Sequence, residues 1–96
     1  MLIIVSYDIS TIDKKGEKRL HKVSKECVKF GQRVQNSVFE CYIDYSSFIL
    51  MKNNLLKIIN KETDNLRFYL IGNNYENKIE NYGKKENYNI SDTIII

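Results

Sequence analysis

The sequence contains no alanine, proline or tryptophan, only two cysteines and a single histidine. Cys27 and Cys41 are too few for a disulfide framework and lack the spacing of metal ligands, so we expect reduced, buried thiols. With His21 alone, a zinc site built from cysteine and histidine is almost excluded. No apolar run reaches the ~18 residues of a membrane span, and the N-terminal run is too short for a signal peptide. These absences predict a cytoplasmic protein.

The length of the chain predicts one domain with a thin core. It has 96 residues, and a domain of this size buries only about 60–65% of the surface of its unfolded chain. A dimer is therefore plausible before any motif is considered. No internal repeat, linker or low-complexity block divides the chain.

Positive charge is concentrated in one segment, although the net charge is only +3. Residues 14–33 hold eight of the fifteen Lys and Arg and only two acids, so this segment is +6 and the remainder is −3. Such an uneven distribution indicates a polyanionic partner more strongly than the isoelectric point does.

A first helix is expected over residues 14–30, with Thr11 or Asp13 as its N-terminal cap and Gly31 after its end. Apolar residues recur there three and four positions apart, which is the pattern of an amphipathic helix. The apolar stripe is Leu20, Val23, Cys27 and Phe30. The opposite face carries Lys14, Lys15, Lys18, Lys22, Lys25 and Lys29.

A second helix is expected from a cap at Ser46 or Ser47 to about residue 60. Its core stripe is Phe48, Met51, Leu55, Ile58 and Ile59. The sequence "KETDN" that follows predicts a turn.

Four strands are expected around these helices. The run "RVQNSVFECYI" is long for one strand and lacks strand-forming residues at "QNS", so we divide it there. One continuous bent strand is the alternative. The resulting strands span residues 2–7, 33–35, 38–43 and 66–71.

The order β-α-β-β-α-β predicts an α+β, ferredoxin-like sandwich with both helices on one face of the sheet. Residues 1–72 form this core, and residues 73–96 form a C-terminal extension of the same domain. The extension ends in "TIII", which predicts a strand that pairs with the edge of a sheet. Lys78–Tyr82 is a weaker strand candidate. Pairing of the extension with a second copy would cover the open face of the sheet in a homodimer.

Four stretches, in order, are similar to a known family: "VSYDIS", "KRLHKV", "GQRVQNSVFEC" and "LRFYLIG". They resemble the CRISPR-associated protein 2 family, a small universal CRISPR adaptation protein also described as a CRISPR-associated endoribonuclease. The resemblance covers residues 1 to about 72, and "RVQNSVFE" is its most specific part. It implies a ferredoxin-like protomer and a symmetric homodimer in which the terminal strand is exchanged onto the partner's sheet.

The same resemblance implies a function in CRISPR adaptation. The homodimer would bridge two dimers of the larger CRISPR integrase, which captures short foreign DNA and inserts it into the CRISPR array. Some members are described as metal-dependent nucleases that act on single-stranded RNA or double-stranded DNA, and others as purely structural.

Asp8 ends the first predicted strand and has two interpretations. Its carboxylate can accept backbone N–H groups and shape the loop that follows. Alternatively it is a ligand of Mg²⁺, or of Mn²⁺, because Mg²⁺ keeps its waters and needs only one or two carboxylates plus phosphate oxygens. A two-fold axis near the end of this strand would bring two copies of Asp8 together around the metal. The resemblance favours the second interpretation, since the metal-binding and catalytic Asp of the family matches Asp8.

The basic residues of the first helix and its end are the predicted contacts to a DNA or RNA backbone. The guanidinium groups of Arg19 and Arg33 suit phosphate oxygens. The family often has paired arginines at the start of this helix, where Lys18 stands here. The predicted nucleic-acid-binding residues are Lys14, Lys15, Lys18, Arg19, Lys22, Lys25 and Arg33.

Three further residues have weaker functional interpretations. Tyr7 could flank the Asp8 site, and Phe39, within the matching block, could stack on a base. For Phe39 a place in the core or in a dimer interface is favoured. His21 is beside the lysine face, where a surface histidine is favoured over a general base.

Three functions compete on these residues. The first is a nucleic-acid-binding scaffold in CRISPR adaptation, and the second is a Mg²⁺-dependent phosphodiesterase with Asp8 as ligand. The third is a ferredoxin-like regulatory dimer that binds a small ligand and does not need the lysines. The absence of a second acid at metal-site spacing from Asp8 favours the scaffold, with nuclease activity as an additional possibility.

Overall fold

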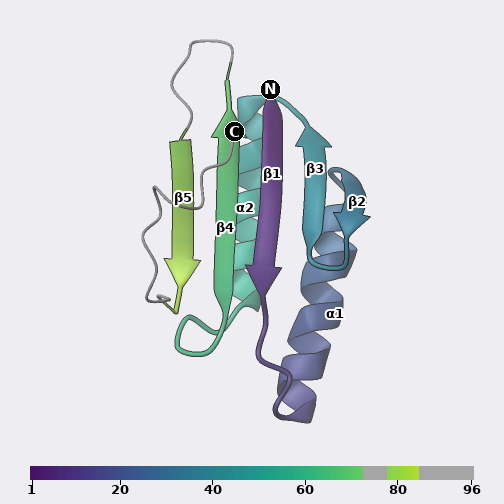
Figure 1. The fold of residues 1–96 in the computed structure, drawn as a ribbon, viewed down its shortest axis with the longest axis vertical. Coiled ribbons are helices and arrows are strands. Elements are labelled where there is room, and N and C mark those ends of the chain that lie inside the picture. Colours follow the sequence, from purple (N-terminus) through teal and green to yellow (C-terminus); the bar gives the residue numbers. More distant parts are fainter. Residues whose placement is uncertain (73–77, 85–96) are drawn as a thin grey trace.

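The fold is a five-stranded antiparallel sheet with two helices behind one of its faces (Figure 1). It comes from a computed structural model that describes residues 1–72 and 78–84. The strands lie in the order β2-β3-β1-β4-β5, which confirms the predicted α+β class and the ferredoxin-like succession. The elements are β1 (Leu2–Asp8), α1 (Lys14–Val28), β2 (Gln32–Gln35), β3 (Val38–Tyr42), α2 (Tyr45–Ile58), β4 (Asn65–Ile71) and β5 (Lys78–Gly83).

The core lies between the sheet and the two helices. Side chains alternate between the two faces of a strand, so Ile3, Val5 and Tyr7 of β1 all point toward the helices and are buried. Phe48 of α2 packs edge-on against Phe68 of β4, with ring centroids 5.3 Å apart. The other buried apolar residues are Ile9, Val23, Cys27, Phe39, Cys41, Met51, Leu55, Ile59, Leu66 and Leu70.

The predicted apolar stripes therefore face the core as expected. Leu20, Phe30 and Ile58 are only partly buried and pack at its margin. Leu66, Phe68 and Leu70 of β4 share the helix-covered face, as the alternation of side chains along a strand requires.

The opposite face of the sheet is not covered by any element within the described residues (Figure 1). Strand register places Ile4 beside Tyr69, and Tyr69 beside Ile79, and all three are partly buried. The prediction that the helices cover one face only is thus confirmed for the described part of the chain. Cover of this open face by a second copy stays a prediction.

The division of "RVQNSVFECYI" into two strands is confirmed. β2 and β3 pair as an antiparallel hairpin, with a register shift between Arg33 and Gln35, so the continuous bent strand is wrong. The stretch "QNS", which lacks strand-forming residues, therefore leads into the turn between β2 and β3.

Helix ends differ in detail from the sequence-based expectations. Asp13 caps α1 by accepting the Gly16 N–H at 2.8 Å, and α1 ends at Val28, two residues earlier than predicted. The cap of α2 is Asp44, which accepts the Ser47 N–H at 2.8 Å, so the predicted caps Ser46 and Ser47 are wrong. A carboxylate one residue before the helix satisfies the exposed N–H as well as a hydroxyl does.

The weaker strand candidate is confirmed as β5, an edge strand paired with β4. Lys52 of α2 joins it to the helix layer through an ion pair to Glu80 of 3.0 Å, and Tyr82 donates to the same carboxylate at 2.7 Å. The predicted terminal strand "TIII" lies outside the described residues, and its exchange between two copies stays a prediction.

Candidate nucleic-acid interface

One exposed face of α1 carries only lysines. At about 100° per residue, Lys14, Lys15, Lys18, Lys22 and Lys25 fall within an arc of about 100° and extend over about 16 Å of helix. We call these five residues the lysine stripe. All five are exposed, and none forms an ion pair with an acid within residues 1–72 and 78–84. The stripe is therefore a row of cations that a polyanion can approach.

Lys29, the sixth lysine of the predicted face, has a different role. It follows the helix, and its Nζ lies 2.9 Å from Oε2 of Glu26. The other carboxylate oxygen of Glu26 accepts from Asn54 of α2 at 2.7 Å. Burial acts to raise the pKa of Glu26, but these two donors outweigh it and hold the pKa below its ordinary value. Lys29 thus helps to fix α1 against α2.

Arg19 lies beside the stripe and is held by Asp64. Its Nε donates to Oδ2 of Asp64 at 2.8 Å, and the Asp64 side chain is completely buried. The same carboxylate accepts the backbone N–H groups of Ser10 at 3.0 Å and Asn60 at 2.9 Å, and the Thr63 hydroxyl at 3.1 Å. Asp64 therefore joins α1, the loop after β1 and the turn before β4.

The contacts of Asp64 determine the direction in which the pKa of its carboxyl group is shifted. Burial acts to raise its pKa, but the Arg19 guanidinium and the two backbone N–H groups outweigh burial and hold the pKa below the usual 3.8. Asp64 has no functional signal in the sequence, because "KETDN" has the composition of an exposed turn. A contact that joins positions 45 and 54 residues apart has no local signal. The predicted role of Arg19 in nucleic-acid binding stays a prediction.

Arg33 is exposed at the edge strand β2, and its side chain lies across the margin of the core. Its guanidinium carbon is 5.2 Å from the centre of the Phe39 ring, and Nη2 donates to the Ser24 hydroxyl of α1. Phe39 is fully buried and stacks on Tyr7, with ring centroids 6.2 Å apart. Tyr7 and Phe39 therefore belong to the core on the helix-covered face, away from the open face of the sheet.

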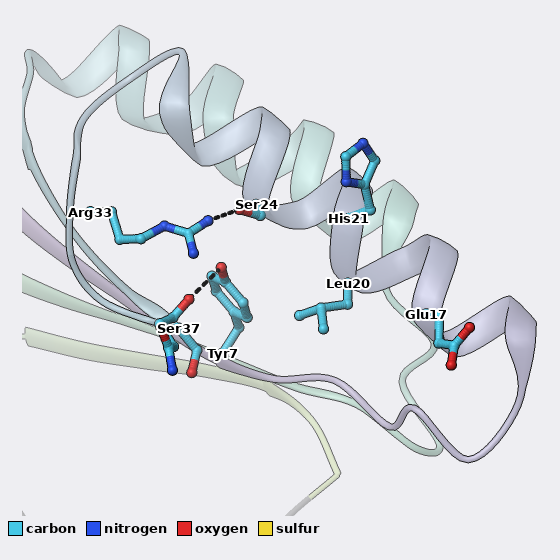
Figure 2. A pocket seen from close by; sticks show the side chains of 8 residues that line it. Tyr7, Glu17, Leu20, His21, Ser24, Arg33 and Ser37 are labelled. Carbon is cyan, nitrogen blue, oxygen red and sulfur yellow. Dashed lines mark hydrogen bonds between the residues drawn. The ribbon is translucent and has the colours of Figure 1, made fainter.

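A hollow of about 470 Å³ opens beside Arg33, between α1 and the β2–β3 turn (Figure 2). We call it the Arg33 hollow. The Tyr7 hydroxyl lies at its base and donates to the Asn36 carbonyl at 3.3 Å, and burial raises the pKa of this phenol. Figure 2 shows Arg33 and Ser24 joined across one end of the hollow, with Leu20 and His21 farther along α1.

Asp8 lies on the other face of the sheet from Tyr7. It is exposed at the end of β1, where strand register places it beside Asn65 of β4. Its carboxylate forms no hydrogen bond or ion pair with residues 1–72 or 78–84, so the loop-shaping interpretation has no support in the described structure. The loop after β1 is instead held by Asp64.

The described part of a single protomer does not contain a complete metal site. No group of three or more His, Cys, Asp or Glu comes together within the described ranges. Asp8 is an exposed single carboxylate, which fits Mg²⁺ only if waters, phosphate oxygens or a second carboxylate complete the coordination. Metal binding at Asp8 stays a prediction.

Both cysteines are reduced and buried, as the sequence predicts. Burial raises the pKa of Cys27 to about 12 and that of Cys41 to about 11. Neither thiol is therefore a nucleophile or a metal ligand at neutral pH.

Within the described residues, no helix is both long and apolar enough to span a membrane.

Comparison with known proteins identifies the family. The family model described as "CRISPR associated protein Cas2" matches residues 1–79. The chain belongs to the Cas2 family. It is 45% identical over 95 residues to the CRISPR-associated endonuclease Cas2 of Halalkalibacterium halodurans, with 99% of each chain covered. It is 44% identical over 96 residues to the CRISPR-associated endoribonuclease Cas2 of Nitratidesulfovibrio vulgaris, covering 100% of this chain and 94% of that protein.

Two solved structures share the fold. The crystal structure of Streptococcus pyogenes Cas2 at pH 6.5 matches with a TM-score of 0.70 and 49% identity, over 78% of this chain and 90% of that one. A hypothetical protein from Thermus thermophilus matches with a TM-score of 0.64 and 32% identity, over 78% and 85% of the two chains. The resemblance that the sequence motifs indicated is thus confirmed.

Proposed function

We propose that this Cas2 chain is a CRISPR adaptation protein whose homodimer binds the backbone of duplex DNA and bridges subunits of the larger CRISPR integrase. The observation that carries the proposal is the lysine stripe, with five exposed cations in one arc of α1, while the acid Glu17 lies at the border of that arc. Charges arranged in this way attract phosphates but do not read base edges. The bound sequence is therefore unimportant.

The dimensions of the stripe suit a duplex. It extends over about 16 Å, and duplex DNA presents one charge per about 1.7 Å of its axis. A single stripe therefore faces several phosphates at once. A symmetric homodimer doubles the stripe and lengthens the surface that a duplex can contact.

The homodimer itself is supported by the open face of the sheet. Ile4, Tyr69 and Ile79 form an apolar row across it, next to a polar row of Ser6, Arg67 and Asn81, and this face has no cover within the described residues. A thin domain gains stability when the apolar part of such a face is buried by a second copy. The face also carries Asp8 at its end, so a two-fold axis there would bring two Asp8 carboxylates into one site.

A Mg²⁺-dependent endonuclease is the second candidate, on single-stranded RNA or double-stranded DNA. It is favoured by the exposed Asp8 carboxylate, which forms no bond with the described residues, and by the relatives described as an endonuclease and an endoribonuclease. In that function the two Asp8 side chains would hold Mg²⁺, which would activate a water for attack on the phosphodiester. The regulatory dimer that binds a small ligand is not favoured, because the chain belongs to the Cas2 family.

The test of backbone binding compares two charge-reversed variants. One replaces Lys18, Lys22 and Lys25 of the stripe with Glu, and the matched control replaces the exposed Lys57, Lys61 and Lys84 with Glu. Both change the net charge equally. Fluorescence anisotropy with a blunt duplex is expected to show that the stripe variant loses binding and the control keeps most of it. Equal loss in both variants would mean that net charge, rather than the stripe, causes binding.

The nuclease candidate is tested on the same proteins. Labelled duplex DNA and single-stranded RNA are incubated with wild type and Asp8→Ala, with Mg²⁺ and with chelator. Cleavage by the wild type that disappears with Asp8→Ala or chelator, while binding is kept, supports Asp8 as a metal ligand. Cleavage that survives the substitution places the activity elsewhere.

A further inference from the structure

We propose that the Arg33 hollow binds the base of one unpaired nucleotide, at the edge of a nucleic acid whose backbone lies along the lysine stripe. This inference rests on the proposed function and adds a preference for unpaired ends to it.

The walls of the hollow suit a base rather than a phosphate. Leu20 and the ring of Tyr7 provide an apolar floor, while Arg33, Ser24 and Asn36 provide hydrogen-bonding groups at its rim. A neutral base has both an apolar face and polar edges, so it matches this lining.

Contacts within the protein fix the Arg33 guanidinium in a position where it can contact such a base. Its guanidinium is fixed at one end by Ser24 and from below by the Phe39 ring, 5.2 Å away. A guanidinium plane held in one position is a stacking surface for unstacked bases, and its other N–H groups can donate to a base edge.

The hollow continues into the lysine stripe. A second depression of about 340 Å³ is lined by Lys14, Lys18 and Lys22 of the stripe. The two depressions share Glu17 and His21. A backbone that follows the stripe therefore passes the mouth of the Arg33 hollow.

Only an unpaired nucleotide can use both surfaces. The bases of an intact duplex are stacked inside it, and their faces are available to a protein only when a nucleotide is unpaired or extruded. The hollow, of about 470 Å³, falls within the ~300–1,000 Å³ of typical small-ligand pockets. It is thus large enough for a single base with part of its sugar.

The experiment uses three DNA probes with one double-stranded sequence. The first is blunt, the second has one unpaired nucleotide at an end, and the third has an abasic residue at that position. We expect the wild type to bind the second probe about tenfold more tightly than the other two, as base stacking on a protein surface predicts. Because the abasic probe has the added phosphate but no base, it separates the two contributions.

Two variants test the hollow and one tests the stripe. Arg33→Gln removes the guanidinium, and Ser24→Leu fills the hollow from a helix position that accepts leucine. Both are expected to lose the preference for the unpaired nucleotide. Lys25→Gln, one residue from Ser24 but on the stripe, is expected to weaken binding of all three probes and keep the preference. Circular dichroism verifies that each variant is folded.

The outcomes distinguish this inference from the function on which it rests. Equal affinity of the wild type for all three probes, or a preference that survives in both Arg33→Gln and Ser24→Leu, overturns the inference and leaves backbone binding intact. Equal gain with the abasic probe also overturns it, since the phosphate would then be the ligand. Binding of none of the probes overturns both.

Discussion

The largest effect of a single substitution on the stability of this fold is expected at Asp64. The substitution Asp64→Ala removes a completely buried carboxylate that accepts from Arg19, from the N–H groups of Ser10 and Asn60, and from Thr63. The two N–H groups lose their partner where water has little access. The Arg19 guanidinium, whose side chain is 19% exposed, loses its counter-charge.

The expected effect is large for a small domain. Breaking a buried ion pair by removing one partner costs about 3–5 kcal/mol, and unfolding of a whole domain costs only about 5–15 kcal/mol. We therefore expect the melting temperature to fall by at least about 10 °C. Urea unfolding followed by circular dichroism measures the change in free energy of unfolding.

The matched control is Asp13→Ala. Asp13 is an exposed carboxylate that accepts one backbone N–H, that of Gly16, as the cap of α1. Its loss should lower the free energy of unfolding by only about 1 kcal/mol. An effect of Asp64→Ala no larger than that of Asp13→Ala would mean that the Asp64 contacts do not stabilise the fold as described.

The same residue predicts an acid dependence of stability. Since the pKa of Asp64 is lowered in the folded state, its stabilising contribution is complete above the ordinary value of 3.8 and disappears as the pH falls through the lower, folded value. Asp64→Asn cannot titrate, so it should be less stable than the wild type at neutral pH but lose less stability below about pH 4. Parallel loss in both proteins would assign the acid dependence to other carboxylates.

Three shorter predictions concern the core and the end of β5. Cys27 and Cys41, with pKa values raised to about 12 and about 11, should not react with a thiol reagent at neutral pH until the chain is unfolded; rapid reaction of the folded protein would contradict their burial. Phe39→Ala should lower the free energy of unfolding by about 3–5 kcal/mol, and a loss below about 1 kcal/mol in urea unfolding would place Phe39 outside the core. Gly83→Ala should also destabilise the protein in thermal melts, because Gly83 has a φ of 98° and a Cβ there would lie 2.1 Å from the Asp64 carbonyl oxygen; an unchanged melting temperature would contradict this close approach.

Local patterns predicted most of the fold. The apolar spacing in both helices, the split at "QNS" and the strand signal of Lys78–Tyr82 all depend on neighbouring residues, and each is confirmed. The cap of α2 was wrong because Asp44, Ser46 and Ser47 are all good capping residues. Only the start of the helix at Tyr45 distinguishes them.

The candidate site was harder to predict because it depends on distant contacts. The sequence gives no sign that Arg19 bonds Asp64, or that Arg33 lies over Phe39 and reaches Ser24. Periodicity did predict that the lysines share one face of α1, because a helix fixes that geometry by itself. The proposed role of Asp8 as a metal ligand rests on groups outside the described protomer that would complete the coordination, and such groups have no signal in the sequence.

The salt dependence of duplex binding distinguishes the lysine stripe from Asp8 as the cause of affinity. The affinities of wild type, Asp8→Ala and the Lys18/Lys22/Lys25→Glu variant are measured between about 50 and 200 mM salt. Ten phosphate contacts by the two stripes of the homodimer predict a slope of log affinity against log salt of about −9 for the wild type. We expect the same slope and affinity for Asp8→Ala, and a slope of about −4 or shallower for the stripe variant. Equal slopes for wild type and stripe variant, or loss of binding with Asp8→Ala, would contradict backbone binding by α1.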